Sequence, residues 1–127
     1  MKSQKFSVSE RLRSFKFAFT GIALMLQSEH NSRIQVAAAV IVILAGMFFK
    51  VSVIEWIALV FAIGFVISLE SVNSSIEKLA DFASPGKNQI IKSVKDLSAA
   101  AVLIASITCA IIGLIIFLPK ILRMLNL

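Results

Sequence analysis

The chain has 127 residues, of which 58% are hydrophobic and only 16% are charged, and its formal net charge is +6. One compact domain fits this length, but the composition lies far from that of water-soluble proteins. Membrane topology and anionic lipid headgroups account for the positive charge, so a nucleic-acid partner is not expected. The composition therefore favours an integral membrane protein.

The first predicted element is an amphipathic helix over residues 8–28. Apolar side chains recur there at alternating intervals of three and four, which places them on one stripe of a helix: Leu12, Phe15, Phe19, Ile22 and Leu26. Basic residues border this stripe. Such a helix either lies in the membrane interface or packs on the cytoplasmic end of a helix bundle, and the sequence alone leaves both open.

Three uncharged stretches follow, over residues 34–49, 57–69 and 97–118. A transmembrane helix needs about 20 mostly apolar residues. The third stretch is long enough alone and is expected to end at Pro119 and Lys120, whereas the other two need interfacial residues such as Lys50, Glu55 and Trp56. We therefore predict an all-α membrane protein whose spans cover about residues 32–50, 53–81 and 96–118.

The orientation follows from the cations that flank these spans, because Lys and Arg favour the cytoplasmic side. Ten of the 13 Lys and Arg residues, Lys2 among them, precede span one or lie between spans two and three. The other three lie on the opposite side. We therefore predict that the N-terminus is inside and the C-terminus is outside.

Polar residues at the end of the second span share one helical face. Glu70, Asn73, Glu77 and Asp81 are spaced at i, i+3, i+7 and i+11, which keeps them within about 60° of one another around a helix. Such a face is costly next to lipid unless it lines a polar or water-filled site. Glu70 is the sharpest case because it directly follows a long stretch without charge.

The predicted topology brings two further polar sets to the same membrane face. Glu29, Asn31 and Arg33 precede the first span, and Lys95 and Asp96 precede the third. Carboxylates and amides suit Mg²⁺, while cations suit phosphate oxygens. One carboxylate at the lipid border would act as a general base on a lipid hydroxyl, which indicates phosphoryl transfer.

Structural explanations compete with this interpretation. Glu77 and Asp81 could simply be solvated, Glu29 could form an interfacial salt bridge, and Lys95 with Asp96 could only flank the third span. A non-enzymatic scaffold would need no carboxylate at the lipid boundary. A small transporter or proton-coupled channel would place ionisable residues near the middle of the membrane, often in paired repeats.

The segments Glu70–Asp81 and Lys95–Ile104 strongly resemble the prokaryotic diacylglycerol kinase family, and the resemblance spans nearly the whole chain. Residues 28–35 and the pair Glu55 and Trp56 are typical of the branch that contains undecaprenol kinases. The resemblance implies a three-span homotrimer in the bacterial cytoplasmic membrane, with an interfacial N-terminal helix and active sites shared between protomers. It implies ATP as co-substrate, Mg²⁺ as cofactor and a membrane lipid alcohol as acceptor, with undecaprenol favoured over diacylglycerol.

The resemblance also implies roles for individual residues. Glu70 would act as the general base, while Glu29 and Glu77 would bind the metal that accompanies ATP. The remaining nucleotide contacts would come from Asn73, Gly86, Lys87, Asn88, Lys95 and Asp96. Asn31 and Arg33 are assigned to the lipid substrate. Glu10 stands where the family has an N-terminal arginine, so Arg11 or Arg13 would take its place.

Overall fold

The computed structural model describes residues 5–127, which form four helices: α1 (Val8–Ser28), α2 (His30–Phe48), α3 (Val53–Ala83) and α4 (Gln89–Met124). Within this described range no residue is in a β-strand. Helices α2, α3 and α4 are each long and apolar enough to cross a membrane. The prediction of an all-α membrane fold with three spans is therefore confirmed. Lys2, one of the cations used to predict orientation, lies outside the described residues.

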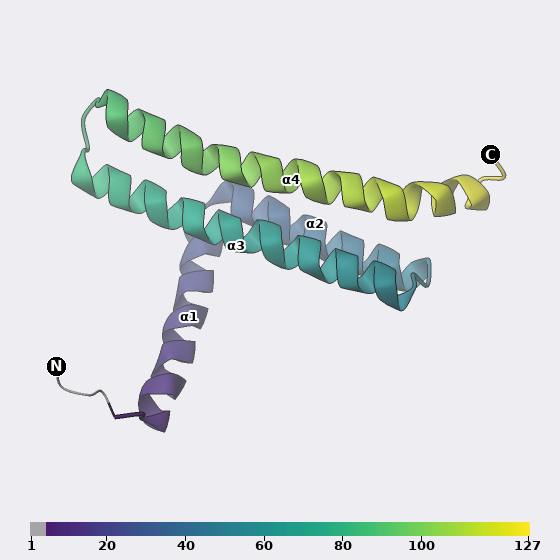
Figure 1. The fold of residues 1–127 in the computed structure, drawn as a ribbon, viewed down its shortest axis with the longest axis horizontal. Helices are drawn as coiled ribbons and strands as arrows, with labels where there is room; N and C mark the ends of the chain where they lie inside the picture. Colours follow the sequence, from purple (N-terminus) through teal and green to yellow (C-terminus); the bar gives the residue numbers. More distant parts are fainter. Residues whose placement is uncertain (1–4) are drawn as a thin grey trace.

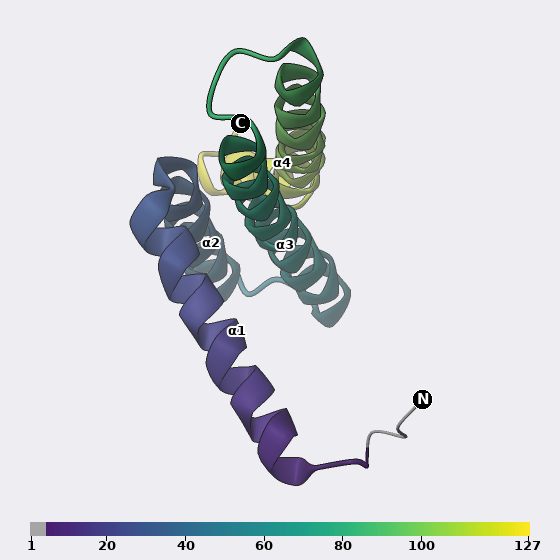
Figure 2. The ribbon, with the colours of Figure 1, turned by 90° about the vertical axis from the view of Figure 1, so that its left-hand side faces the viewer.

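The three long helices form a bundle in which α3 contacts both α2 and α4. Helix α4 returns alongside α3 after the loop that joins them, and α2 lies on another side of α3 (Figure 1). Helix α1 leaves this bundle at a steep angle (Figure 1), and Figure 2 shows that it extends away from the other helices. Only Met25 of α1 is buried, so within one protomer this helix is not packed along the bundle, and its apolar side chains remain exposed.

The corner between α1 and α2 is held by Arg33. Glu29 interrupts the helix with an extended backbone, φ −116° and ψ 116°. The guanidinium group of Arg33 donates hydrogen bonds of 2.7 Å to the carbonyls of Leu26 and Gln27. Carbonyls at a helix end have no partner within the helix, so these two bonds stabilise the end of α1 and fix the corner.

A hydrophobic cluster lies at the opposite end of the bundle. Val51, Leu59 and Ile116 form its buried core, with Trp56 packed against it. A Cβ atom added to Gly46 would lie only 2.6 Å from the Trp56 ring. The absence of a side chain at Gly46 therefore allows the close approach of α2 to the indole.

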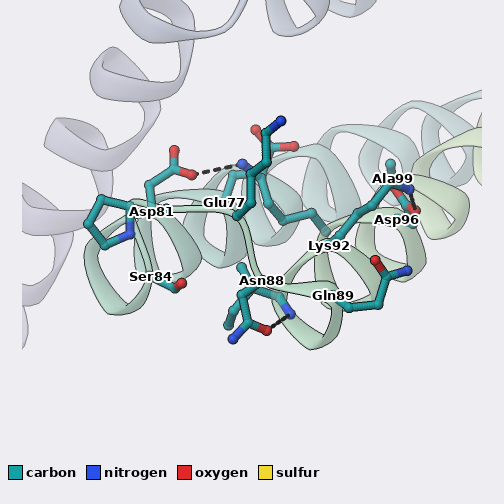
Figure 3. Close-up of a pocket in the computed structure, with 13 residues that line it drawn as sticks. Glu77, Asp81, Ser84, Asn88, Gln89, Lys92, Asp96 and Ala99 are labelled. Carbon is teal, nitrogen blue, oxygen red and sulfur yellow. Dashed lines mark hydrogen bonds and ion pairs between the residues drawn. The ribbon is translucent and has the colours of Figure 1, made fainter.

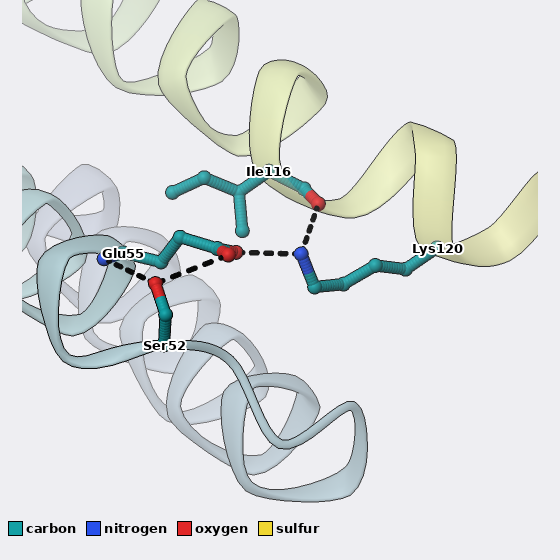
Figure 4. A network of polar contacts seen from close by, with 4 residues as sticks. All are labelled: Ser52, Glu55, Ile116 and Lys120. Carbon is teal, nitrogen blue, oxygen red and sulfur yellow. Dashed lines mark hydrogen bonds and ion pairs between the residues drawn. The ribbon is translucent and has the colours of Figure 1, made fainter.

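An ion pair joins α3 to α4 at this end (Figure 4). The ammonium of Lys120 lies 2.6 Å from a carboxylate oxygen of Glu55 and also donates to the carbonyl of Ile116 at 3.3 Å. Ser52 caps α3 and donates to Glu55 at 3.2 Å.

The helix α4 is longer than the span that the sequence predicts. It begins at Gln89, where the side-chain oxygen of Asn88 accepts hydrogen bonds from the backbone N–H groups of Ile90 and Ile91. It also continues through Pro119 to Met124, beyond the residues at which the third membrane span is expected to end. Proline is tolerated in membrane helices where neighbouring groups support the backbone, and Lys120 anchors this turn to α3.

Candidate active site

A pocket of about 710 Å³ lies where α3 ends and α4 begins. Side chains of both helices and of the connecting loop surround it, as Figure 3 shows. Most of them are polar or charged. The pocket is lined by Glu77, Asp81, Ser84, Pro85, Gly86, Lys87, Asn88, Gln89, Ile91, Lys92, Lys95, Asp96 and Ala99. We call it the loop pocket.

A second pocket, of about 280 Å³, lies deeper along the bundle, between α2, α3 and α4. Its lining mixes polar groups with the apolar side chains of the spans: Asn31, Ile34, Gln35, Glu70, Asn73, Ala99, Val102, Leu103 and Ser106. We call it the span pocket. The two pockets share Ala99, and Asn73 of one precedes Glu77 of the other by about one helical turn. They are therefore neighbours along one face of α3.

Glu70 is the most deeply buried charged residue of the site, with only 2% of its surface exposed. Its oxygen Oε2 is fully buried and no donor meets it in full hydrogen-bond geometry, although the Ser32 hydroxyl lies near enough to act on the carboxylate. Glu29 and Glu77 both lie near enough to act electrostatically on this carboxylate. A buried carboxylate without a partner is costly in an apolar environment, so its position requires an explanation beyond packing.

Of the three lysines that line the loop pocket, Lys92 and Lys95 are engaged in ion pairs. Lys95 lies 2.7 Å from Asp81 of α3, and Lys92 lies 2.6 Å from Asp96 one turn further along α4. Lys95 precedes the uncharged stretch 97–118 and is thus outside the membrane-spanning part of α4. Its hydrogen bond to the Asp81 carboxylate raises the pKa of the Lys95 ammonium. Lys95 is therefore held in its positively charged form beside the pocket.

Polar side chains also connect the helices around the span pocket. The hydroxyl of Ser98 donates to the side-chain oxygen of Asn73 at 2.6 Å, which links α4 to α3. The amide of Gln35 donates to the Ser106 hydroxyl at 3.0 Å and links α2 to α4. Sequence reasoning missed Ser98, Gln35 and Ser106. The sequence feature that could have identified these three residues is their polarity within otherwise apolar spans.

Most of the residues predicted from sequence line one of the two pockets. The loop pocket contains Glu77, Gly86, Lys87, Asn88, Lys95 and Asp96, and the span pocket contains Asn31, Glu70 and Asn73. Two do not line either pocket. Glu29 is the residue between α1 and α2, and Arg33 binds the carbonyl end of α1. Asn88 also has a structural role, because its side-chain oxygen caps α4.

The carboxylates suit a magnesium–nucleotide complex better than a metal site built by the protein alone. Among residues 5–127 of this protomer, no group of three His, Cys, Asp or Glu side chains is arranged to hold an ion. Mg²⁺ usually takes one or two protein carboxylates and completes its coordination with water and substrate phosphates. Glu77 in the loop pocket and Glu29 near Glu70 fit that donor set.

Comparison with known proteins assigns the chain to a family. Residues 16–117 match the model of the family described as prokaryotic diacylglycerol kinase. An undecaprenol kinase of Bacillus subtilis is 34% identical over 119 residues, covering 94% of this chain and 97% of that protein. A diacylglycerol kinase of a Synechocystis species is 30% identical over 115 residues, covering 90% of this chain and 66% of that protein. The chain therefore belongs to the prokaryotic diacylglycerol kinase family.

Proposed function

We propose that this protein transfers the γ-phosphate of ATP to the hydroxyl of a membrane lipid, with undecaprenol as the preferred acceptor. The observation that carries this proposal is the adjacency of the two pockets along α3. One is polar and large enough for phosphates and part of a nucleotide. The other combines apolar walls with a buried carboxylate, as a lipid hydroxyl would require.

The proposed reaction follows from the groups that face each pocket. The phosphates of ATP bind in the loop pocket, where Lys95 exchanges its partner Asp81 for a phosphate oxygen. The lipid hydroxyl enters the span pocket beside Glu70. Glu70 takes the hydroxyl proton, the lipid oxygen forms a bond to the γ-phosphorus, and the bond to the β-phosphate oxygen breaks to release ADP. Asn73, between the two pockets, orients the reacting groups.

Glu29 and Glu77 would hold Mg²⁺ together with the phosphates. When bound, the ion neutralises charge that develops on the transferring group. The protein residues supply the remaining effects: they position the two substrates, keep bulk water away from Glu70 and place the cations of α4 beside the phosphates. Because Glu70 is almost fully buried, the lipid substrate itself would complete its hydrogen bonding.

We also propose that the active form is a homotrimer in the bacterial cytoplasmic membrane, with sites completed between protomers. The observation that supports assembly is that Glu29 does not line either pocket of its own chain. A neighbouring protomer would enclose the site more completely.

The acceptor lipid is tested by a direct competition. Purified protein in detergent receives radiolabelled ATP, Mg²⁺ and equimolar undecaprenol and diacylglycerol, and the products are separated by chromatography. We expect labelled undecaprenyl phosphate to dominate. Label mainly in phosphatidic acid would instead favour the diacylglycerol kinase activity named for the Synechocystis relative. Absence of label in either lipid would overturn the lipid kinase proposal.

A further inference from the structure

Ser32 has an unusual environment for a serine hydroxyl. It lies near the start of α2, only 1% of its surface is exposed, and its Oγ has no acceptor in full hydrogen-bond geometry. A buried hydroxyl without a partner is unfavourable. Ser32 and Glu70 are 1% and 2% exposed, and they approach each other from α2 and α3.

The backbone explains why this hydroxyl is not already used. Helical serines of this protein commonly donate to the carbonyl four residues earlier, as Ser14, Ser28 and Ser75 do. For Ser32 the corresponding carbonyl belongs to Ser28, the last residue of α1, across the break at Glu29. The break in the helix therefore leaves the Ser32 hydroxyl available to a group on another helix.

We propose that Ser32 is a positioning residue that donates its hydroxyl to the buried oxygen Oε2 of Glu70. Both atoms are buried and each lacks another partner, and the hydroxyl hydrogen can rotate towards the carboxylate. The bond would fix the carboxylate so that its other oxygen meets the acceptor hydroxyl in the span pocket. Ser32 does not line that pocket, so it acts through Glu70 and does not contact the substrate.

Ser74 is the nearest alternative donor, since its hydroxyl is also buried and has no partner. It lies on the same helix as Glu70 and one turn later, where a small rotation of its side chain returns it to the Glu70 carbonyl. Ser32 has no such local acceptor within its own helix. The pairing across α2 and α3 is therefore assigned to Ser32.

This inference rests on the proposed function, so it is tested with four proteins in the same phosphate-transfer assay: wild type, Ser32→Ala, Glu70→Gln and the double variant. Loss of one hydrogen bond to a charged group should lower kcat of Ser32→Ala roughly tenfold, with KM for ATP unchanged. In the Glu70→Gln background, removal of the Ser32 hydroxyl should have little further effect, because the group it positions is absent. Ser32→Cys, a weaker donor, should fall between wild type and Ser32→Ala.

Ser75→Ala serves as the matched control, because Ser75 is exposed and bonds only to its own helix. It should keep wild-type kcat, and the melting temperature of Ser32→Ala should stay close to that of wild type. A tenfold loss of kcat that recurs in the Glu70→Gln background would overturn the positioning role of Ser32. A loss of kcat that accompanies a lowered melting temperature would do the same. Neither result would overturn the proposed function. A wild-type protein that transfers no phosphate would overturn the proposed function and this inference together.

Discussion

Lys95 of α4 and Asp81 of α3 form an ion pair of 2.7 Å across the loop pocket. Their side chains are 34% and 67% exposed. Exposed pairs contribute little to stability because water and salt screen them. The pair therefore holds a cation at the edge of the pocket without strongly fixing the fold, as the proposed exchange of Asp81 for a phosphate oxygen requires.

The first prediction concerns this lysine. Lys95→Met should raise KM for ATP roughly tenfold, the loss expected for one charge-assisted hydrogen bond to phosphate. The melting temperature should change little. Lys78→Met is the control, since Lys78 is exposed on α3 and lines neither pocket. An equal rise in KM for both variants would show that only the overall positive charge matters.

The second prediction concerns the metal. Glu77 lines the loop pocket, so Glu77→Gln should raise the Mg²⁺ concentration needed for half-maximal activity while the protein remains folded. The amide is a weaker ligand for a hard cation than the carboxylate. Titrating Mg²⁺ at fixed ATP measures the effect. Wild-type activity of the variant at limiting Mg²⁺ would exclude Glu77 from metal binding.

The third prediction is topological. A reporter fused after Leu127 should face the exterior, and one inserted next to Gly86, in the loop between α3 and α4, should face the cytoplasm. The reason is the distribution of Lys and Arg around the spans. Protease or alkaline phosphatase accessibility in intact cells measures both. Reversal of either result would separate the loop pocket from cytoplasmic ATP.

The fourth prediction tests packing at the opposite end of the bundle. A methyl group at Gly46 would meet the Trp56 ring at 2.6 Å, so Gly46→Ala should cost about 1–3 kcal/mol through overpacking. Gly64→Ala is the matched control, because a Cβ atom there has no other group within 4 Å. Thermal unfolding in detergent compares the melting temperatures of the two variants. Equal melting temperatures would mean that the indole moves away without cost.

Much of the fold could be predicted because it depends on local patterns. Apolar periodicity predicts the helix over residues 8–28, and long uncharged stretches predict three spans. The extension of α4 through Pro119 was not predictable in the same way. It depends on the contacts of Lys120 with Glu55 of α3 and with the Ile116 carbonyl, and residue 55 is distant in sequence.

The site was predictable to the extent that helical spacing determines it. The spacing of Glu70, Asn73 and Glu77 predicts one shared helical face, and all three line one or other of the two pockets. The role of Arg33 was not, because its acceptors exist only where the chain breaks at Glu29. Pairings such as Gln35 with Ser106 join residues 71 positions apart. Sequence spacing along one helix carries no information about such contacts between helices.

The central claim is that Glu70 acts on the lipid hydroxyl, and Glu70→Gln tests it most directly. Turnover and melting temperature are measured on the same purified variant. A general base commonly contributes about 10²- to 10⁴-fold in rate, so turnover should fall by roughly that factor. The melting temperature should stay the same or rise, because a desolvated charge is removed. Near-normal turnover in the folded variant would contradict the claim and remove Glu70 from the catalytic role.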